Sequence, residues 1–201
     1  MMQNDTNKKL AFDMLQESMN SYFTLSSKTW QSLLDISFFE EIKKGDVICS
    51  INDLPKYFSF VYKGLFRSYI IDDKGKEYNK NFFDEGTYPG SMVALLTNTY
   101  SLFEIEALED SLIIHIDFKA YRELLIKADD LKLFQIYYLE KNWLIHKDAR
   151  EVSIVQEDAQ ERYEDFLNNY SSLGARLSQF HIASHLGITP TQLSRIRKKQ
   201  Q

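Results

Sequence analysis

The sequence predicts an α+β protein: an N-terminal antiparallel β-roll of the double-stranded β-helix or jelly-roll type with flanking helices, a long dimerisation helix, and a C-terminal all-α helix-turn-helix domain. Three observations carry this prediction. Short β-type runs separated by turn residues fill residues 42–116, a seven-residue apolar repeat begins at residue 131, and two short helical patterns follow residue 178. We place the three segments at 1–128, 129–155 and 156–201.

Composition describes a globular chain of 201 residues, of which 44% are hydrophobic and 14% aromatic. A chain of this length can bury a real core. Its apolar runs are far shorter than the 18 to 20 residues, roughly, that a membrane span needs. Asp13 and Glu17 interrupt the first apolar stretch, which is therefore no signal peptide. We expect a cytoplasmic protein with no membrane partner. We expect Cys49, the single cysteine, to be a buried strand residue.

The two expected helices before the roll lie within residues 6–35, the second capped by Ser26 or Ser27. The strands of the roll are expected at 47–51, 58–62, 65–71, 78–83, 103–108 and 112–116. Their regular spacing, with glycine- and aspartate-containing turns between them, is typical of an antiparallel roll or sandwich. Residues 92–96 predict one helical turn inserted into it.

A long helix is predicted from about residue 130 to residue 155. Its apolar seam is formed by Leu131, Phe134, Tyr138, Ile145, Val152 and Val155, and is interrupted by Lys141 and Asp148. A seven-residue repeat favours packing against the same helix of a second copy, so we expect these apolar residues at a dimer interface. A helix docked on the β-roll of its own chain would show much the same pattern, and this alternative stays open.

Charge is divided unevenly along the chain. The formal net charge is −5, yet residues 166–201 contain no Asp or Glu and five basic residues, so residues 1–165 carry −10. The basic residues are Arg176, Arg195, Arg197, Lys198 and Lys199. Such segregation predicts that the C-terminal end faces a polyanion while the remainder is repelled from it.

Residues 179–198 carry the small and apolar residues that a helix-turn-helix requires. Ala183 is small where the helices cross, and Gly187 stands at the turn, where a positive φ costs glycine little. Thr189 is a suitable N-cap and Pro190 suits the first helical position. The shared apolar face is formed by Ile182, Leu186, Ile188, Leu193 and Ile196.

The remaining face of the second helix predicts contacts with double-stranded DNA. Gln suits adenine and Arg suits guanine in the major groove. We expect base contacts from Thr191, Gln192, Ser194 and Arg195. We expect backbone contacts from Gln179, Thr189, Arg197, Lys198 and Lys199. The alternative is a sensor or dimerisation module whose basic helices bind an acidic protein surface.

The run Ile182-Ala-Ser-His-Leu-Gly-Ile-Thr-Pro190, the following Leu193-Ser-Arg-Ile-Arg197 and the preceding Glu161-Arg-Tyr163 resemble the Crp/Fnr family of bacterial transcription regulators, closest to its Bacteroidetes-type subgroup. Weaker matches are Lys44-Gly-Asp46, Asp73-Lys-Gly-Lys-Glu77 and Ile105-Glu-Ala-Leu-Glu109. The resemblance covers most of the chain. It implies a cyclic-nucleotide-binding-like sensor over 1–128, a dimerisation helix and hinge over 129–155, and a DNA-binding domain over 156–201. It also implies a homodimer on a pseudo-palindromic operator, with RNA polymerase as a further candidate partner.

Two departures from this family bear on the expected ligand and on DNA contacts. Members that bind cyclic nucleotides carry a Gly-Glu-Leu-like turn and a downstream arginine, whereas this chain has Gly90, Ser91 and Met92 there and no arginine in residues 97–103. Burying a phosphate without a cationic partner is costly. We therefore expect these three residues to line a pocket for an unknown effector, not for cyclic AMP or GMP. Because the sequence ends at Gln201, we also expect no β-hairpin wing.

The sequence offers few residues for a metal site or for an enzyme active site. His181 and His185 are four residues apart on a helix, a spacing that can bind zinc, but no third ligand stands nearby in the sequence. A cupin-like enzyme needs several histidines in the roll, which has His115 alone. Walker, dinucleotide-binding and nucleophile-elbow motifs are missing from the sequence. We expect no enzymatic activity, no metal and no cofactor.

Overall fold

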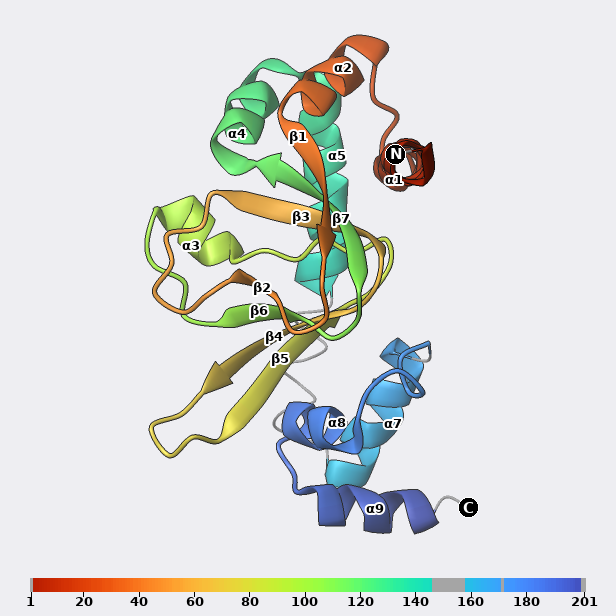
Figure 1. The fold of residues 1–201 in the computed structure, drawn as a ribbon, viewed down its shortest axis with the longest axis vertical. Helices are drawn as coiled ribbons and strands as arrows, with labels where there is room; N and C mark the ends of the chain where they lie inside the picture. The colour runs from red at the N-terminus through yellow and green to blue at the C-terminus, as the bar shows by residue number, and fades with distance from the viewer. Residues whose placement is uncertain (1, 146–157, 171, 200–201) are drawn as a thin grey trace.

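The computed structural model describes residues 2–145, 158–170 and 172–199. A β-roll with helices on its outer side occupies one end of the molecule, and a group of three short helices occupies the other (Figure 1). Within the described ranges, no helix combines the length and apolarity that crossing a bilayer requires.

Seven strands form the roll: β1 (Ser37–Ile42), β2 (Val47–Cys49), β3 (Tyr57–Lys63), β4 (Phe66–Ile71), β5 (Glu77–Phe83), β6 (Glu104–Ala107) and β7 (Ser111–Asp117). They pair antiparallel in two sheets of order β1-β7-β3 and β2-β6-β4-β5. The six predicted strands are present. β1 was not predicted, because three of the six residues of this edge strand are exposed and its Ser-Phe-Phe-Glu-Glu run does not alternate strictly.

Apolar residues pack on both sides of the β1-β7-β3 sheet. Val61 and Ile113 lie in a cluster with Phe66 and Ile105 from the other sheet. On the opposite side, Phe60 and its neighbours pack against the helices and form the largest cluster of the molecule. Burying both faces explains why β3 and β7 read as nearly continuous apolar runs.

The helices around the roll are α1 (Met2–Asn20), α2 (Ser27–Asp35), α3 (Met92–Thr97) and α4 (Phe118–Lys127). Ser26 caps α2 as predicted, because its hydroxyl accepts a hydrogen bond from the Thr29 backbone N–H at 3.2 Å. The helix α4 was not predicted from the sequence. Its start is fixed by Asp117, whose carboxylate accepts a hydrogen bond from the Ala120 N–H at 2.8 Å.

The helix predicted for dimerisation docks on the roll of its own chain. It consists of α5 (Asp129–Leu139) followed by a π-helical turn, η1 (Glu140–Leu144). Leu131 and Phe134 are 0% and 4% exposed, and Tyr138 packs against the same cluster. The prediction that these three residues face a partner is therefore wrong: the seven-residue repeat is satisfied by the core. Ile145 is exposed, whereas Val152 and Val155 lie outside the described residues.

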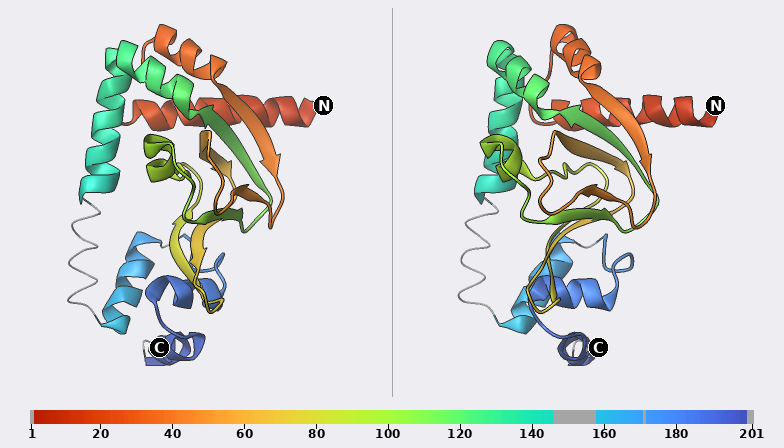
Figure 2. Two further views of the ribbon diagram at one scale, coloured as in Figure 1. Left: turned by 90° about the vertical axis from the view of Figure 1, so that its left-hand side faces the viewer. Right: turned by 60° about the vertical axis from the view of Figure 1, so that its left-hand side comes forward.

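At the far end, α7 (Ala159–Asn169), α8 (Gln179–Leu186) and α9 (Pro190–Lys199) share one apolar cluster. Leu65 and Phe82 of the roll also belong to this cluster. The β4–β5 hairpin extends from the roll to α8, and both views of Figure 2 show this contact. We call α7, α8 and α9 together the head.

Candidate nucleic-acid interface

The turn between α8 and α9 has the geometry that its residues predict. Ser178 caps α8 by accepting a hydrogen bond from the His181 N–H at 3.2 Å. Gly187 ends α8 with φ +70°, a left-handed conformation that favours glycine. Thr189 then caps α9, since its hydroxyl accepts a hydrogen bond from the Gln192 N–H at 3.2 Å. Pro190 is the first residue of α9.

One face of α9 is exposed and basic. Thr191, Arg195 and Lys198 are spaced as i, i+4 and i+7, which places them on the same side of the helix, and all three are exposed. Leu193, on the side of α9 that packs against the rest of the head, is fully buried. Lys199 is exposed next to this face, whereas Ser194 is half-buried. We call Thr191, Arg195 and Lys198 the exposed stripe of α9.

Three residues expected to contact DNA make contacts within the head instead. The Gln192 side-chain carbonyl accepts a hydrogen bond from the Thr189 N–H at 2.9 Å and so completes the cap of α9. The Gln179 amide donates to the Pro190 carbonyl at 2.6 Å and ties α8 to α9. Arg197 is half-buried and donates to the Tyr163 hydroxyl at 2.9 Å. In this structure these side chains hold α9 in place.

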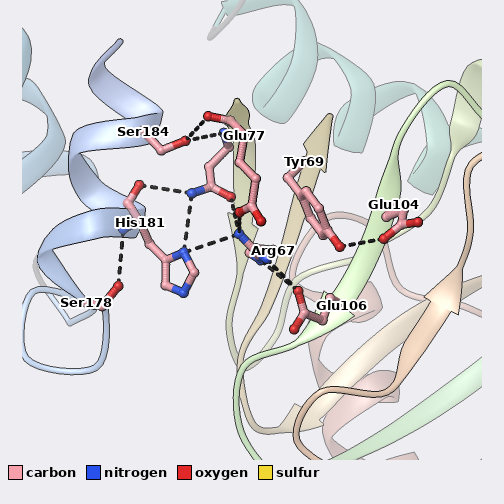
Figure 3. Close-up of polar contacts among 9 residues, drawn as sticks. Arg67, Tyr69, Glu77, Glu104, Glu106, Ser178, His181 and Ser184 are labelled. Atoms are coloured by element: carbon pink, nitrogen blue, oxygen red, sulfur yellow. Dashed lines mark hydrogen bonds and ion pairs between the residues drawn. The ribbon is translucent and has the colours of Figure 1, made fainter. Parts of the chain in front are cut away.

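Backbone and side-chain hydrogen bonds join α8 to β5 (Figure 3). The Ser184 hydroxyl donates to the Glu77 carbonyl at 2.8 Å and accepts from the Asn79 N–H at 3.0 Å. The Asn79 side chain donates to the His181 carbonyl at 3.1 Å. His185 donates through Nδ1 to the Asn79 carbonyl at 3.0 Å. The two histidines considered for zinc therefore face this hairpin.

Beneath this contact lies Arg67, a guanidinium that is only 6% exposed. It forms ion pairs with Glu77 and, at 2.7 Å, with Glu106, and donates to the Asn79 side-chain carbonyl at 3.2 Å. It also lies 3.3 Å from Nδ1 of His181. Because a guanidinium only donates, this nitrogen of His181 accepts and the ring is neutral. This role of Arg67 was not predicted, since a lone arginine in a predicted strand carries no signal for such a contact.

A second ion-pair group fixes the loop before α8. Arg176 donates to Glu85 and Glu109 of the roll, with closest contacts of 2.8 Å to each, and these hydrogen bonds raise the pKa of Arg176. Tyr170 donates to the Asn81 side chain at 2.6 Å beside it. One of the five C-terminal positive charges, that of Arg176, is thus paired within the protein.

Docking of the head is expected to weaken at acidic pH. Burial lowers the pKa of His181, and the positive charge of Arg67 lowers it further, so the docked state favours the neutral ring. An undocked His181 regains its ordinary pKa near 6.5. The stabilisation is therefore complete above about pH 6.5 and is lost as the pH falls below it. Calorimetric unfolding between pH 8 and pH 5.5 measures this loss.

The control is His181→Gln, which retains a hydrogen-bond acceptor for Arg67 but does not titrate. We expect a smaller decrease of the unfolding midpoint with falling pH in this variant than in the unchanged protein. Other titrating groups, such as the buried His115, contribute to both proteins alike. Equal pH dependence in the two proteins would show that His181 is not the sensitive group.

Residues 39–128 match the family profile of the cyclic nucleotide-binding domain. This part of the chain is thus similar to cyclic nucleotide-binding domains. Similar solved structures cover more of the chain than this profile does. FixK2 from Bradyrhizobium japonicum is 17% identical with a TM-score of 0.69, covering 82% of this chain and 84% of that one. The regulator CLP from Xanthomonas campestris, described as responsive to c-di-GMP, is 14% identical with a TM-score of 0.67, covering 87% and 91%.

A third structure, a putative Crp/Fnr-family transcriptional regulator from Eubacterium rectale, is 19% identical with a TM-score of 0.61 and covers 87% of this chain and 83% of that one. The predicted resemblance to Crp/Fnr regulators is thus confirmed at the level of the domain and the fold. A search of curated proteins found no match. The Bacteroidetes-type subgroup remains a prediction.

Within the cyclic nucleotide-binding domain, Gly90, Ser91 and Met92 do not converge on one pocket. The Ser91 side chain is buried and its hydroxyl accepts a hydrogen bond from Ser101 at 3.0 Å. Gly90 packs so closely that a Cβ there would lie 2.9 Å from the Cβ of Phe58. Gly90 lines one cavity, while Met92 lines another, which faces α5. The turn is thus closed by contacts within the protein.

Proposed function

We propose that the protein is a sequence-specific DNA-binding transcriptional regulator of the Crp/Fnr type, in which α8 and α9 act as a helix-turn-helix. The observation that carries this proposal is the exposed stripe of α9. A helix whose one face is buried at Leu193 and whose other face presents Thr191, Arg195 and Lys198 is suited to the major groove. Arg195 would contact a guanine, and Lys198 and Lys199 would contact phosphates.

The charge of the head supports binding to a polyanion. Arg176, which precedes α8, is paired with Glu85 and Glu109. The exposed charged residues of α9 are Arg195, Lys198 and Lys199. Residues 166–201 contain no carboxylate side chain that could oppose them. The acidic remainder of the chain would orient the molecule with the head toward the DNA.

We propose that the regulator binds as a homodimer through the outer side of α5 and η1. Leu133, Ile136 and Leu144 are 36%, 48% and 61% exposed there, although they are large apolar residues. Exposed apolar side chains clustered on one helix indicate a surface that a partner covers. We propose this surface in place of the seam of Leu131, Phe134 and Tyr138, because those three side chains pack in the core of the same chain. A two-fold dimer would bind operator half-sites about 34–36 Å apart.

Ile136→Glu is expected to convert the dimer into a monomer, because a carboxylate in an apolar interface is desolvated without a partner. Light scattering coupled to size-exclusion chromatography at micromolar concentration measures the mass. Ile71→Glu is the matched control. Ile71 is 47% exposed and Ile136 is 48% exposed, but Ile71 lies at the end of β4. A dimer that survives Ile136→Glu, or a monomeric unchanged protein, would contradict this interface.

We propose that a cyclic nucleotide is not the effector. The Ser91 hydroxyl is bonded to Ser101, and residues 97–103 carry no arginine to pair with a cyclic phosphate. The β-roll contacts the head through Arg67, Asn79 and Arg176, so a change in the roll can alter how the two heads of a dimer are oriented. This coupling is the proposed route of regulation.

The test is selection of bound fragments from a genomic DNA library with the purified full-length protein, repeated at several salt concentrations. Enrichment of a pseudo-palindrome would support the proposal. Affinity for it should fall by about 0.9 log units per log unit of salt for each phosphate neutralised. Absence of any enriched sequence, together with binding to an acidic protein surface, would instead favour a sensor module that contacts a protein.

A further inference from the structure

A cavity of about 130 Å³ lies between α5, α3 and the outer face of the β1-β7-β3 sheet. Figure 2 shows α3 beside α5 on this side of the roll. Phe58 and Ile116 of the sheet contribute to its walls, as do Met92 of α3 and Phe134 and Tyr138 of α5. Nothing in the DNA-binding proposal uses this cavity.

The interior of the cavity is uncharged. The hydroxyl of Tyr121 donates to Gln135 at 2.6 Å, and that of Tyr88 is 3.1 Å from the Ser18 hydroxyl. Burial raises the pKa of Tyr138 to about 12, and it raises the pKa values of Tyr88 and Tyr121 as well. These phenols are therefore neutral at physiological pH and are already bonded to protein groups. Arg122, the charged residue of the lining, is exposed.

The walls are predominantly aromatic. Tyr88 and Tyr138 meet edge to face with ring centres 5.3 Å apart, and Phe58 and Tyr121 do so at 5.1 Å. A further ring placed among them would gain the same edge-to-face and offset contacts. An apolar cavity of about 150 Å³ holds benzene, so a cavity of about 130 Å³ is close to the size that one six-membered ring requires.

The mouth of the cavity lies at the π-helical turn. Trp143, in η1, lines it and is 50% exposed, and Leu96 of α3 lines it and is 58% exposed. The Asn142 amide stabilises the widened turn by donating to the Tyr138 carbonyl at 2.9 Å. Single π turns inside helices occur frequently at functional sites. Here the turn places a half-exposed indole at the entrance of an aromatic cavity.

We propose that this cavity binds a small neutral aromatic molecule with a single six-membered ring. Size limits the ligand to one ring, the walls apart from the exposed Arg122 carry no charge that would pair with an anion, and the aromatic side chains favour a planar molecule over an aliphatic one. Trp143 closes over the ligand at the mouth. Binding of the molecule is measured on the protein without DNA, so failure of this proposal is distinguishable from failure of the DNA-binding proposal.

The probe is 4-fluorophenol, titrated with the purified full chain and observed by ¹⁹F NMR. We expect saturable binding with a dissociation constant of about 1 mM or below. Met92→Trp fills the cavity and should weaken binding about 10-fold or more. Val93→Trp is the matched control, since it adds the same side chain to the same helix at a position 61% exposed, and should leave binding unchanged. The unfolding midpoint of each variant verifies that it is folded.

A second measurement locates the ligand without filling the cavity. 4-Fluorophenol should quench the fluorescence of Trp143, and Trp143→Phe, which retains Trp30 as the other tryptophan, should abolish the saturable part of the quenching. 4-Fluorobenzoate, of nearly the same size but anionic, should bind about 10-fold more weakly. Lack of saturable binding, equal weakening by Val93→Trp, or preference for 4-fluorobenzoate would each overturn the proposal.

Discussion

Phe82→Ala is expected to lower the free energy of unfolding by about 3–5 kcal/mol, the usual cost of removing a buried phenylalanine ring. Phe82 lies on β5, is 3% exposed and packs among rings of the head. Its ring centre is 5.3 Å from that of His185 and 5.9 Å from that of Tyr170. The ring therefore joins the β-roll to the head, and its loss should release the head before it unfolds the roll.

Hydrogen exchange followed by mass spectrometry distinguishes release of the head from general destabilisation. We expect amides of α8 to exchange faster in Phe82→Ala, while amides of the β1-β7-β3 sheet retain their protection. Ile71→Ala is the control: this residue ends the neighbouring strand of the same hairpin, is 47% exposed, and should change stability by less than about 0.5 kcal/mol. Equal loss of protection in head and sheet would show that Phe82 belongs to the core of the roll alone.

Arg195→Ala is expected to weaken binding to the preferred operator by about 1–3 kcal/mol, or roughly 5- to 150-fold, and to relax base preference at one position of each half-site. Arg195 is exposed in the middle of the stripe, between Thr191 and Lys198, and can reach a guanine edge while flanking groups contact the backbone. Equilibrium binding to the selected operator and to variants at each position measures both effects.

Lys199→Ala is the matched control on the same helix. Lys199 is exposed beside the stripe and is proposed to contact a phosphate, so its loss should weaken binding alike on every sequence and reduce the salt slope. If Arg195→Ala behaves in the same way, Arg195 contacts only phosphate and the base contact must be assigned elsewhere. Gln192 is the less suitable candidate, because its carbonyl is engaged in capping α9.

The sequence predicted the local features of the candidate site well, since these depend on neighbouring residues. Ser178, Gly187 and Thr189 act at helix ends, where the identity of one side chain decides the backbone geometry. The strands were predictable for a similar reason, because alternating or continuous apolar runs between turns reflect burial. An edge strand such as β1, with three of its six residues exposed and without strict alternation, gave too weak a pattern.

What packs against the apolar face of α5 could not be predicted from the sequence. The repeat of Leu131, Phe134 and Tyr138 predicted an apolar face but not what would cover it, since a second helix and a β-sheet require the same side chains. In the tertiary structure this face packs against the core of the same chain. Leu133, Ile136 and Leu144 are therefore left exposed on the other side of the helix.

What the sequence determined by itself is that a short, capped pair of helices with a basic face follows an antiparallel roll, because periodicity, turn chemistry and charge are local properties. Only the tertiary structure decided which of those charges remain free. Arg176 and Arg197 belong to the same basic segment as Arg195, yet the first pairs with Glu85 and Glu109 and the second bonds to Tyr163. Their partners lie 34 to 91 positions away in the chain, and a contact over such separations depends on how the elements pack, which no local pattern encodes.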